Sequence, residues 1–262
     1  MQRKSMLRYF FDILSPIVLR LIIALIVELV LIGLLKKDAS DLYPYINQIT
    51  ALSSLLTIPF LLLMMRYDRK KEMATGKQRS KKAPLMKYVY VVGISIAFAI
   101  AFNNVLMLSN LAEYSTAYQE AAESMYSVSL SVQIVCLGII IPIMEELIFR
   151  GVIFQRMKMS GSVAHAIVSS SVLFGFYHGN SVQFIYATAS GVLLAYLCEK
   201  YGSIKAPILA HVLMNIVSCI LTEVDMFTWM FSEKIRLAVI TMACAFMASV
   251  MFLFIRKIEE KP

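Results

Sequence analysis

The sequence predicts an all-α, polytopic membrane protein built as a bundle of about eight transmembrane helices. The first observation is composition: apolar residues make up 59% of the 262 residues and charged residues only 16%, whereas soluble domains average about 45–50% and about 25%. The second is that apolar residues gather in runs of about 20, the length that crosses a bilayer. The third is a charge difference that alternates between successive loops. These observations exclude a soluble domain, a disordered chain and a disulfide scaffold.

Eight apolar runs define the expected helices. They cover roughly residues 13–35, 46–65, 87–108, 128–150, 163–179, 182–199, 205–222 and 235–255. The first run is too long for a cleaved signal peptide, so we expect it to be an anchor. The hydrophilic segment 66–87 is expected to be a basic loop that sets orientation and contacts anionic lipid rather than nucleic acid. We divide the chain into three N-terminal spans (1–125), a core (126–222) and a C-terminal helix (223–262).

The distribution of lysine and arginine indicates how these helices are oriented. Most of these residues fall on the side of the two termini and of segment 66–87, whereas the opposite side has only Lys36, Lys37, Lys234 and Arg236. Because cytoplasmic loops are enriched in Lys and Arg, both termini are expected in the cytoplasm. A compact multi-pass chain of this kind suits a bacterial plasma membrane.

Ionisable side chains inside the apolar runs need a reason, because a charge in the hydrocarbon core is costly unless it is paired or hydrated. Four places stand out: Glu28 in the first run, Glu145-Glu146 with Arg150 in the fourth, His178 at the end of the fifth and His211 in the seventh. We expect a structural role for Glu28. In a helix, Glu146 and Arg150 lie four residues apart on one face and can pair. Glu145 points about 100° away and lacks that cation, which suits a base that accepts a proton. A buried ion cluster that only fixes helix packing would contain the same residues.

Two further pairs of residues are spaced so that both side chains lie on one face of a helix. Phe174 lies four residues before His178 and can form a wall beside the imidazole, and His211 and Asn215 are also four residues apart. Each pair alone also fits a satisfied contact between helices. A hairpin of antiparallel helices that turns near Gly161 would bring the fourth and fifth runs level. We therefore expect these groups around one cavity inside the membrane, nearer its cytoplasmic side.

The three motifs resemble, in order and spacing, those of the CPBP intramembrane proteases, the group that contains the type II CAAX prenyl endopeptidases and the bacterial Abi and bacteriocin-processing proteins. They read Glu145-Glu146-x-x-x-Arg150, Phe174-x-x-x-His178 and His211-x-x-x-Asn215, and the resemblance covers roughly residues 128–220. It implies hydrolysis of peptide bonds in membrane-associated proteins or in leader and signal peptides, with 126–222 as the catalytic core.

The resemblance and the chemistry of the side chains together suggest roles. Glu145 is expected to take a proton from the attacking water, and Glu146 to pair with Arg150 and keep the first carboxylate in place. His178 would orient the same water or bind a metal. Donors from His211 and Asn215 would stabilise the oxyanion that develops on the carbonyl.

A divalent metal is one open alternative. Zinc binds His nitrogen and carboxylate oxygen, commonly with three protein ligands in catalytic sites, and Glu146, His178 and His211 are the candidate ligands. A metal-free glutamate mechanism fits the same side chains, and no HExxH pair is present in the sequence.

Two other classes of protein compete with the protease. An ion-coupled transporter would place Glu28 and the glutamate pair on an ion path, but the sequence shows no internal repeat of the kind that is common in transporters. A non-catalytic immunity or scaffold protein would use the same fold without cleaving peptides.

Overall fold

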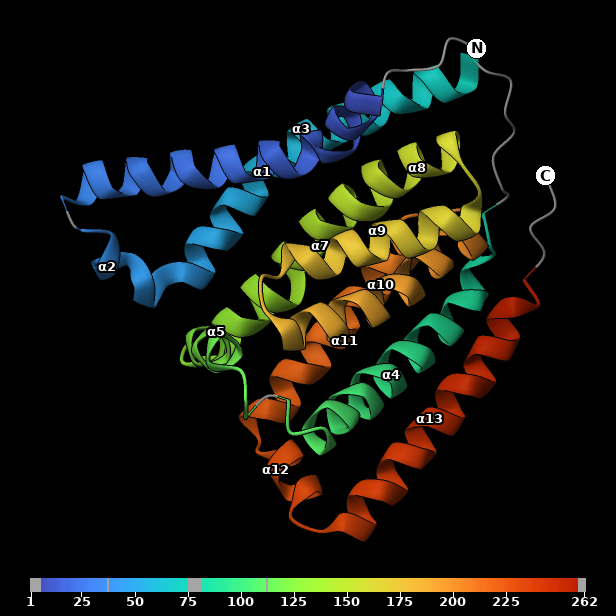
Figure 1. Ribbon diagram of the computed structural model, residues 1–262. Coiled ribbons are helices and arrows are strands. Elements are labelled where there is room, and N and C mark those ends of the chain that lie inside the picture. The colour runs from blue at the N-terminus through green and yellow to red at the C-terminus, as the bar shows by residue number, and fades with distance from the viewer. Residues whose placement is uncertain (1–5, 37, 75–81, 112, 259–262) are drawn as a thin grey trace.

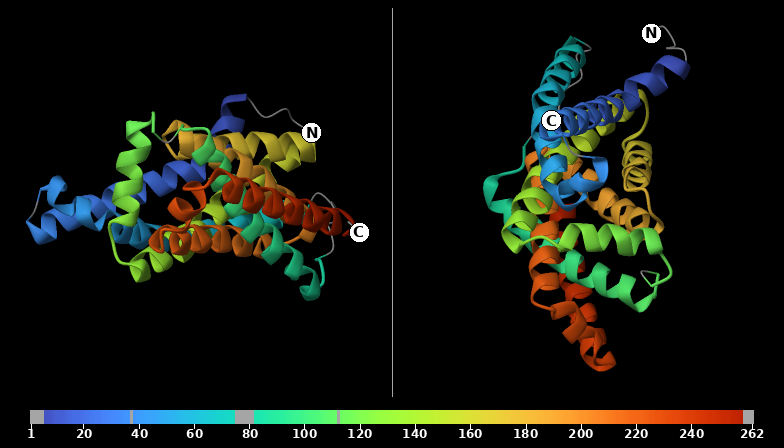
Figure 2. Two further views of the ribbon diagram at one scale, coloured as in Figure 1. Left: turned by 90° about the horizontal axis from the view of Figure 1, so that it is seen from below. Right: turned by 90° about the vertical axis from the view of Figure 1, so that its left-hand side faces the viewer.

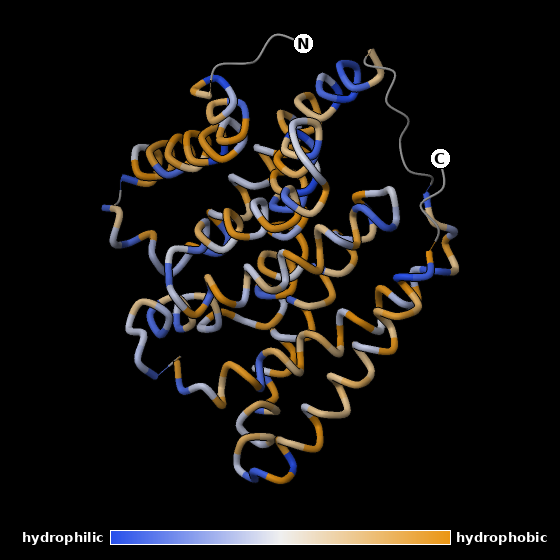
Figure 3. The backbone as a smooth tube through the Cα atoms, turned by 45° about the vertical axis from the view of Figure 1, so that its right-hand side comes forward, coloured by the Kyte–Doolittle hydropathy of each residue, from blue (hydrophilic) through white to orange (hydrophobic). Residues whose placement is uncertain are grey.

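The computed structural model describes residues 6–36, 38–74, 82–111 and 113–258. All regular elements in this part of the chain are helices, which confirms the predicted fold class. Seven helical segments are long and apolar enough to cross a membrane: Met6–Leu35, Ala39–Ala74, Leu85–Leu108, Leu130–Ser160, Ser181–Tyr201, Lys205–Glu223 and Lys234–Arg256. Hydrophobic residues follow the helices, and hydrophilic ones gather towards their ends (Figure 3). The chain is therefore a multi-pass membrane protein.

The expected span 163–179 is shorter than predicted. Helix α9 (Val163–Tyr177) has 15 residues. At 1.5 Å per residue it extends about 22 Å, less than the roughly 30 Å of a hydrocarbon core. Its start is fixed by Ser162, whose side chain accepts a hydrogen bond from the backbone N–H of His165. The described residues therefore contain seven helices long enough to cross the membrane and one shorter apolar helix, where the sequence predicted eight spans.

The helices form three groups in space (Figure 1). Helix α1 packs on α3, α9 packs on α10, and α4 packs on both α13 and α11. Large apolar side chains of α1 and α13 are exposed, as expected for helices that face lipid. The bounds of the long helices are α1 Met6–Leu35, α3 Ile46–Ala74, α4 Tyr88–Leu108, α10 Ser181–Tyr201, α11 Lys205–Glu223 and α13 Lys234–Arg256.

The segment Leu130–Ser160 is one helix whose winding changes along its length. It consists of α6 (Leu130–Gln133), the π-helix η3 (Ile134–Ile140), α7 (Ile141–Glu146), the π-helix η4 (Leu147–Ile153) and α8 (Phe154–Ser160). Wider π-helical turns inside α-helices occur frequently at functional sites. Here the glutamate pair ends the short α-helical stretch between the two.

Short elements occupy the ends of the bundle. Helix α5 (Thr116–Tyr126) lies across the direction of the long helices, as both views of Figure 2 show. The others are α2 (Ala39–Leu42), η1 (Tyr43–Tyr45), η2 (Leu85–Lys87) and α12 (Met226–Phe231). Helices α2, α5 and α12 lie at one end, and the start of α1 and the end of α13 lie at the other (Figure 1).

The expected basic loop 66–87 begins as a helix, because α3 continues to Ala74; residues 75–81 of that loop lie outside the described residues. In the helical part, Asp68 Oδ2 accepts a hydrogen bond from Arg156 Nε at 2.6 Å. Arg156 also donates to Ser15 Oγ at 2.9 Å. This arginine therefore joins α8 to α1 and α3 at the end of the bundle where α1 starts and α13 ends.

Close packing of α9 on α10 depends on Gly175. A β carbon at this position would lie 2.1 Å from Thr188 Oγ1 and 2.8 Å from the Phe184 carbonyl oxygen, far inside van der Waals contact. The two helices can therefore approach only because this residue has no side chain, and together they form one wall of the site.

Candidate active site

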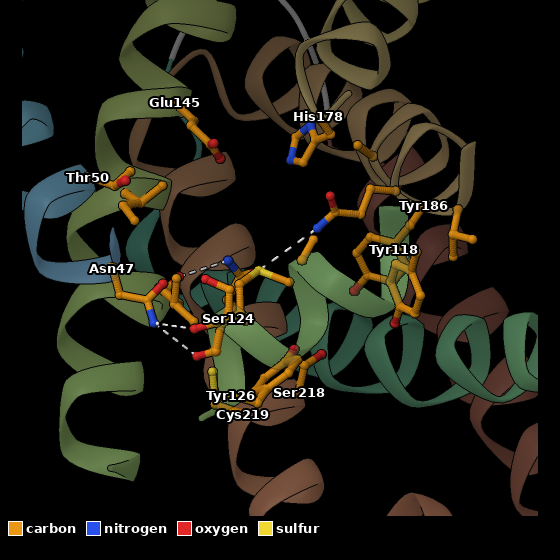
Figure 4. A pocket seen from close by; sticks show the side chains of 18 of the residues that line it. Asn47, Thr50, Tyr118, Ser124, Tyr126, Glu145, His178, Tyr186, Ser218 and Cys219 are labelled. Atoms are coloured by element: carbon orange, nitrogen blue, oxygen red, sulfur yellow. Dashed lines mark hydrogen bonds between the residues drawn. The ribbon is translucent and has the colours of Figure 1, made fainter. Parts of the chain in front are cut away.

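One cavity brings together most of the residues that the sequence singles out. It has a volume of 410 Å³, and its lining includes Glu145, Phe174, His178, His211 and Asn215. Glu145 and His178 face each other across one end of it (Figure 4). From there the cavity extends to α5. Its open volume therefore runs away from the end of the bundle where α1 starts and α13 ends, which is the end expected to be cytoplasmic.

Glu146 and Arg150 lie behind the cavity wall rather than in it. Both are 0% exposed, and Arg150 Nη1 donates to Glu146 Oε1 at 2.7 Å. Arg150 Nη2 donates to the Gly191 carbonyl at 3.1 Å, and the guanidinium carbon lies 4.5 Å from the centre of the Phe174 ring. The expected pair between positions 146 and 150 is present, and three neighbours hold the guanidinium in place.

His211 connects the two glutamates. Its Nδ1 lies 2.9 Å from Glu146 Oε1, and its Nε2 lies 3.8 Å from Glu145 Oε2. An ionised carboxylate only accepts hydrogen bonds, so Nδ1 is the donor toward Glu146. In the neutral ring, Nε2 is then the acceptor that faces Glu145. Glu146 thus fixes which nitrogen of His211 is presented to the cavity.

The same logic applies to His178. Its Nδ1 lies 2.9 Å from the carbonyl oxygen of Phe174, which can only accept, so Nδ1 donates and Nε2 is left for the cavity. The Phe174 ring stands edge-on to both imidazoles, with centroid distances of 4.8 Å to His178 and 5.7 Å to His211. Phe174 therefore separates the two histidines, and both rings have one nitrogen fixed by a neighbour.

Asn215 compensates for a proline. In the π-helical turn of η3, Ile141 donates its backbone N–H to the Cys136 carbonyl, five residues back. The next donor in this pattern would be residue 142, which is a proline and has no N–H. The Leu137 carbonyl is thereby left without that helical donor, and Asn215 Nδ2 donates to it at 2.9 Å. One N–H of Asn215 is used in this way, and its side chain still lines the cavity.

The expected metal ligands are not assembled. In the part of the chain that the structure describes, no three His, Cys, Asp or Glu side chains are placed to hold one ion. Glu146 belongs to the candidate set with His178 and His211, but its Oε1 already accepts hydrogen bonds from both Arg150 and His211. Glu146 Oε1 thus serves as the partner of two other groups, whereas its Oε2 has no hydrogen-bond partner. The divalent-metal alternative stays a prediction.

Helix α5 closes the far end of the cavity. Asn47, at the start of α3, is buried, and its Nδ2 donates to the backbone carbonyls of Ser124 and Met125 at 3.3 and 3.0 Å (Figure 4). Gln133, also buried, donates to the Tyr126 carbonyl at 3.3 Å. Two buried amides therefore hold the C-terminal turn of α5, whereas α5 itself has no buried side chain.

Arg20 is a charged residue beside the site that the motifs do not reveal. It lies near the middle of α1, is 5% exposed, and donates from Nη2 to the Thr50 carbonyl at 3.4 Å. An arginine inside the apolar run 13–35 is the signal that points to it. Glu28, in the same helix, is exposed and belongs to the outer surface of the bundle.

Comparison with known proteins shows which family this part of the chain resembles. The model of the type II CAAX prenyl endopeptidase Rce1-like family matches residues 127–217. This segment is therefore similar to the Rce1-like endopeptidases. The matched segment includes every site residue that the sequence singled out, from Glu145 to Asn215. The chain is also similar to a protein of Bacillus subtilis (strain 168) named "Putative membrane peptidase YdiL", which is 28% identical over 176 residues, 63% of this chain and 68% of that protein. No solved structure matches the chain significantly.

Proposed function

We propose that this protein is an intramembrane endopeptidase in which Glu145 activates water. The observation that carries the proposal is that the two glutamates have different surroundings. Glu146 is fully buried and held by Arg150 and His211, whereas Glu145 lines the cavity and has no cation as close. A carboxylate placed in this way is available to accept a proton from a molecule inside the cavity.

The attacking water fits between Glu145 and His211. Glu145 Oε2 and His211 Nε2 lie 3.8 Å apart, and both are acceptors when the imidazole is neutral, so one water can donate a hydrogen bond to each. As the water oxygen bonds to the peptide carbonyl carbon, Glu145 takes its proton. The C–N bond of the tetrahedral intermediate then breaks, and the proton held by Glu145 goes to the leaving amine. The products are a carboxylic acid and an amine.

The carbonyl oxygen becomes negative in this step and needs a donor. The second N–H of Asn215 is our candidate, because the first is bound to Leu137. One such donor is typically worth about 2.7–4 kcal/mol to the reaction. Phe174 keeps the two imidazoles apart, and His178 Nε2 accepts a hydrogen bond from the water or from the substrate backbone. The proposed mechanism is metal-free, and it is supported by the presence of Glu145, His178, His211 and Asn215 in the lining of one cavity.

The proposed substrates are membrane-associated proteins or leader and signal peptides. Apart from Glu145 and the two histidines, the cavity lining consists of apolar, hydroxyl and amide side chains among the described residues, which suits an uncharged stretch of polypeptide. The proposed location is a bacterial plasma membrane with both termini in the cytoplasm, as the charge distribution predicts.

Comparative peptidomics of membranes tests the proposal. Cells that contain the wild-type protein are compared with cells that contain Glu145→Gln, and with Glu28→Gln as a matched control of another carboxylate in the same protein. We expect peptides that depend on Glu145 but not on Glu28, and a decrease of about 10²- to 10⁴-fold in cleavage when one of them is tested with purified Glu145→Gln protein. Peptide pools that do not differ would favour the non-catalytic scaffold instead.

A further inference from the structure

Arg20 is a cation in an unusual position for a membrane protein. It is 5% exposed, near the middle of the membrane-spanning helix α1. Charged side chains at such a depth are rare and costly, and they face the interior of the bundle when they have a function. Arg20 follows this rule, because its guanidinium points to α3 and α9 rather than to lipid, as its contacts with Thr50 and Tyr177 show.

Arg20 has no carboxylate partner among the described residues. Its contacts are with the Thr50 carbonyl and the Tyr177 hydroxyl, and its Nε has no hydrogen-bond partner. An unpaired Nε does not by itself distinguish Arg20, because Arg150 has one too although it forms an ion pair. The difference between the two buried arginines is the missing carboxylate partner, so the charge of Arg20 is available to act at longer range.

Tyr177 connects Arg20 to the site. Its hydroxyl interacts with Arg20 and lies within the electrostatic influence of the Glu145 carboxylate. Its ring packs on Phe149 at a centroid distance of 5.4 Å, and the next residue in the chain is His178, 5.9 Å away between centroids. One phenol thus interacts with the buried cation, lies within the field of the Glu145 carboxylate and directly precedes the cavity histidine.

The formal charges around the site support the same interpretation. Glu145 and Glu146 contribute two negative charges, and Arg150 supplies one positive charge to Glu146. Arg20 supplies the second positive charge, so that the buried groups balance. Low dielectric makes such a balance important, because charge interactions are weakened less there than in water.

We propose that Arg20 is a positioning residue for the peptidase reaction, which acts through Tyr177 to balance the charge of Glu145 and to hold the end of α9 that carries His178. The inference rests on the proposed function. It adds α1, which lies outside the residues that match the Rce1-like family, to the residues that support the site. Because Arg20 lies behind Thr50 and not in the cavity lining, it should affect the chemical step rather than the binding of substrate.

Two substitutions at position 20 test whether the charge of Arg20 is needed or only its contact between helices. Arg20→Gln keeps hydrogen-bond donors and loses the charge, and Arg20→Lys keeps the charge. With a peptide substrate and purified protein, we expect Arg20→Gln to lower kcat about 10- to 100-fold, the range seen for partners that orient a functional group from behind, with KM changed less than about twofold. Arg20→Lys should retain kcat within about fivefold, because the ammonium keeps the charge without the planar fork.

Further variants complete the test. Tyr177→Phe removes only the hydroxyl and should lower kcat in the same direction as Arg20→Gln. Glu28→Gln, in the same helix, should change nothing. All variants are compared by their amount in the membrane and their thermal midpoint in detergent, so that a folding defect is recognised.

Three outcomes would overturn the inference. They are normal kcat in Arg20→Gln, equal losses in Arg20→Gln and Arg20→Lys, or normal kcat in Tyr177→Phe. Failure of the proposed function is seen separately, since it would appear as an active Glu145→Gln protein. If Glu145→Gln is inactive and Arg20→Gln is normal, only the role of Arg20 is refuted.

Discussion

Replacing Arg150 with leucine tests whether the ion pair behind the cavity holds the helices together. The substitution removes the partner of Glu146 at 2.7 Å and the donor to the Gly191 carbonyl at 3.1 Å, and it leaves a carboxylate that is 0% exposed. Breaking a buried pair from one side typically costs about 3–5 kcal/mol. In a chain of this size each kcal/mol lowers the thermal midpoint by about 2–4 °C, so we expect a decrease of about 6–20 °C.

The informative comparison is the double variant Glu146→Leu/Arg150→Leu. Apolar residues of similar volume often replace a buried ion pair without loss, so the double variant should unfold at a higher temperature than Arg150→Leu alone, measured by size-exclusion chromatography of heated protein in detergent. It should remain inactive, because His211 would lose the carboxylate that fixes its ring. A double variant that is less stable than the single one would refute the reasoning.

Two more predictions concern backbone positions near the site. Gly191→Ala places a β carbon 3.0 Å from Ser171 Cβ, and this overpacking should lower the free energy of unfolding by about 1–3 kcal/mol. The control is Gly33→Ala, which has nothing within 4 Å of the added carbon and should leave the thermal midpoint unchanged or raise it. Equal midpoints for the two variants would contradict this prediction. Asn215→Leu leaves the Leu137 carbonyl without a donor and should lower the free energy of unfolding by about 1–3 kcal/mol. The loss should be smaller in a protein that also carries Pro142→Ala, because that substitution restores a backbone N–H. The double-mutant cycle of thermal midpoints measures this coupling, and strict additivity would argue against it.

The sequence predicts those parts of the structure that follow from simple periodicity. Apolar runs locate the membrane-spanning helices, and the spacing between positions 146 and 150 predicts the pair that the structure contains. The spacing around Gly161 likewise brings Glu145 and His178 to one cavity. These are local rules, in which residue separation alone decides which side chains can meet.

Other features depend on contacts between distant segments. The short length of α9 and the π-helical turns η3 and η4 depend on how neighbouring helices pack, and the sequence pattern does not contain that information. The use of Asn215 as the donor to Leu137 follows from Pro142 only once the helix is known to be π-helical there. Arg20 carried a visible signal, a charge inside an apolar run, but its neighbours on α3 and α9 could not be known from its own segment.

The way α5 is attached has a consequence for how molecules reach the cavity. Two buried amides hold this crosswise helix by its backbone, and none of its own side chains is buried. Segments with few buried side chains open locally at a lower free energy than the core. We therefore expect α5 to open more easily than α7, whose two glutamates are buried. Opening of the far end of the cavity would then leave the spacing of the glutamates unchanged.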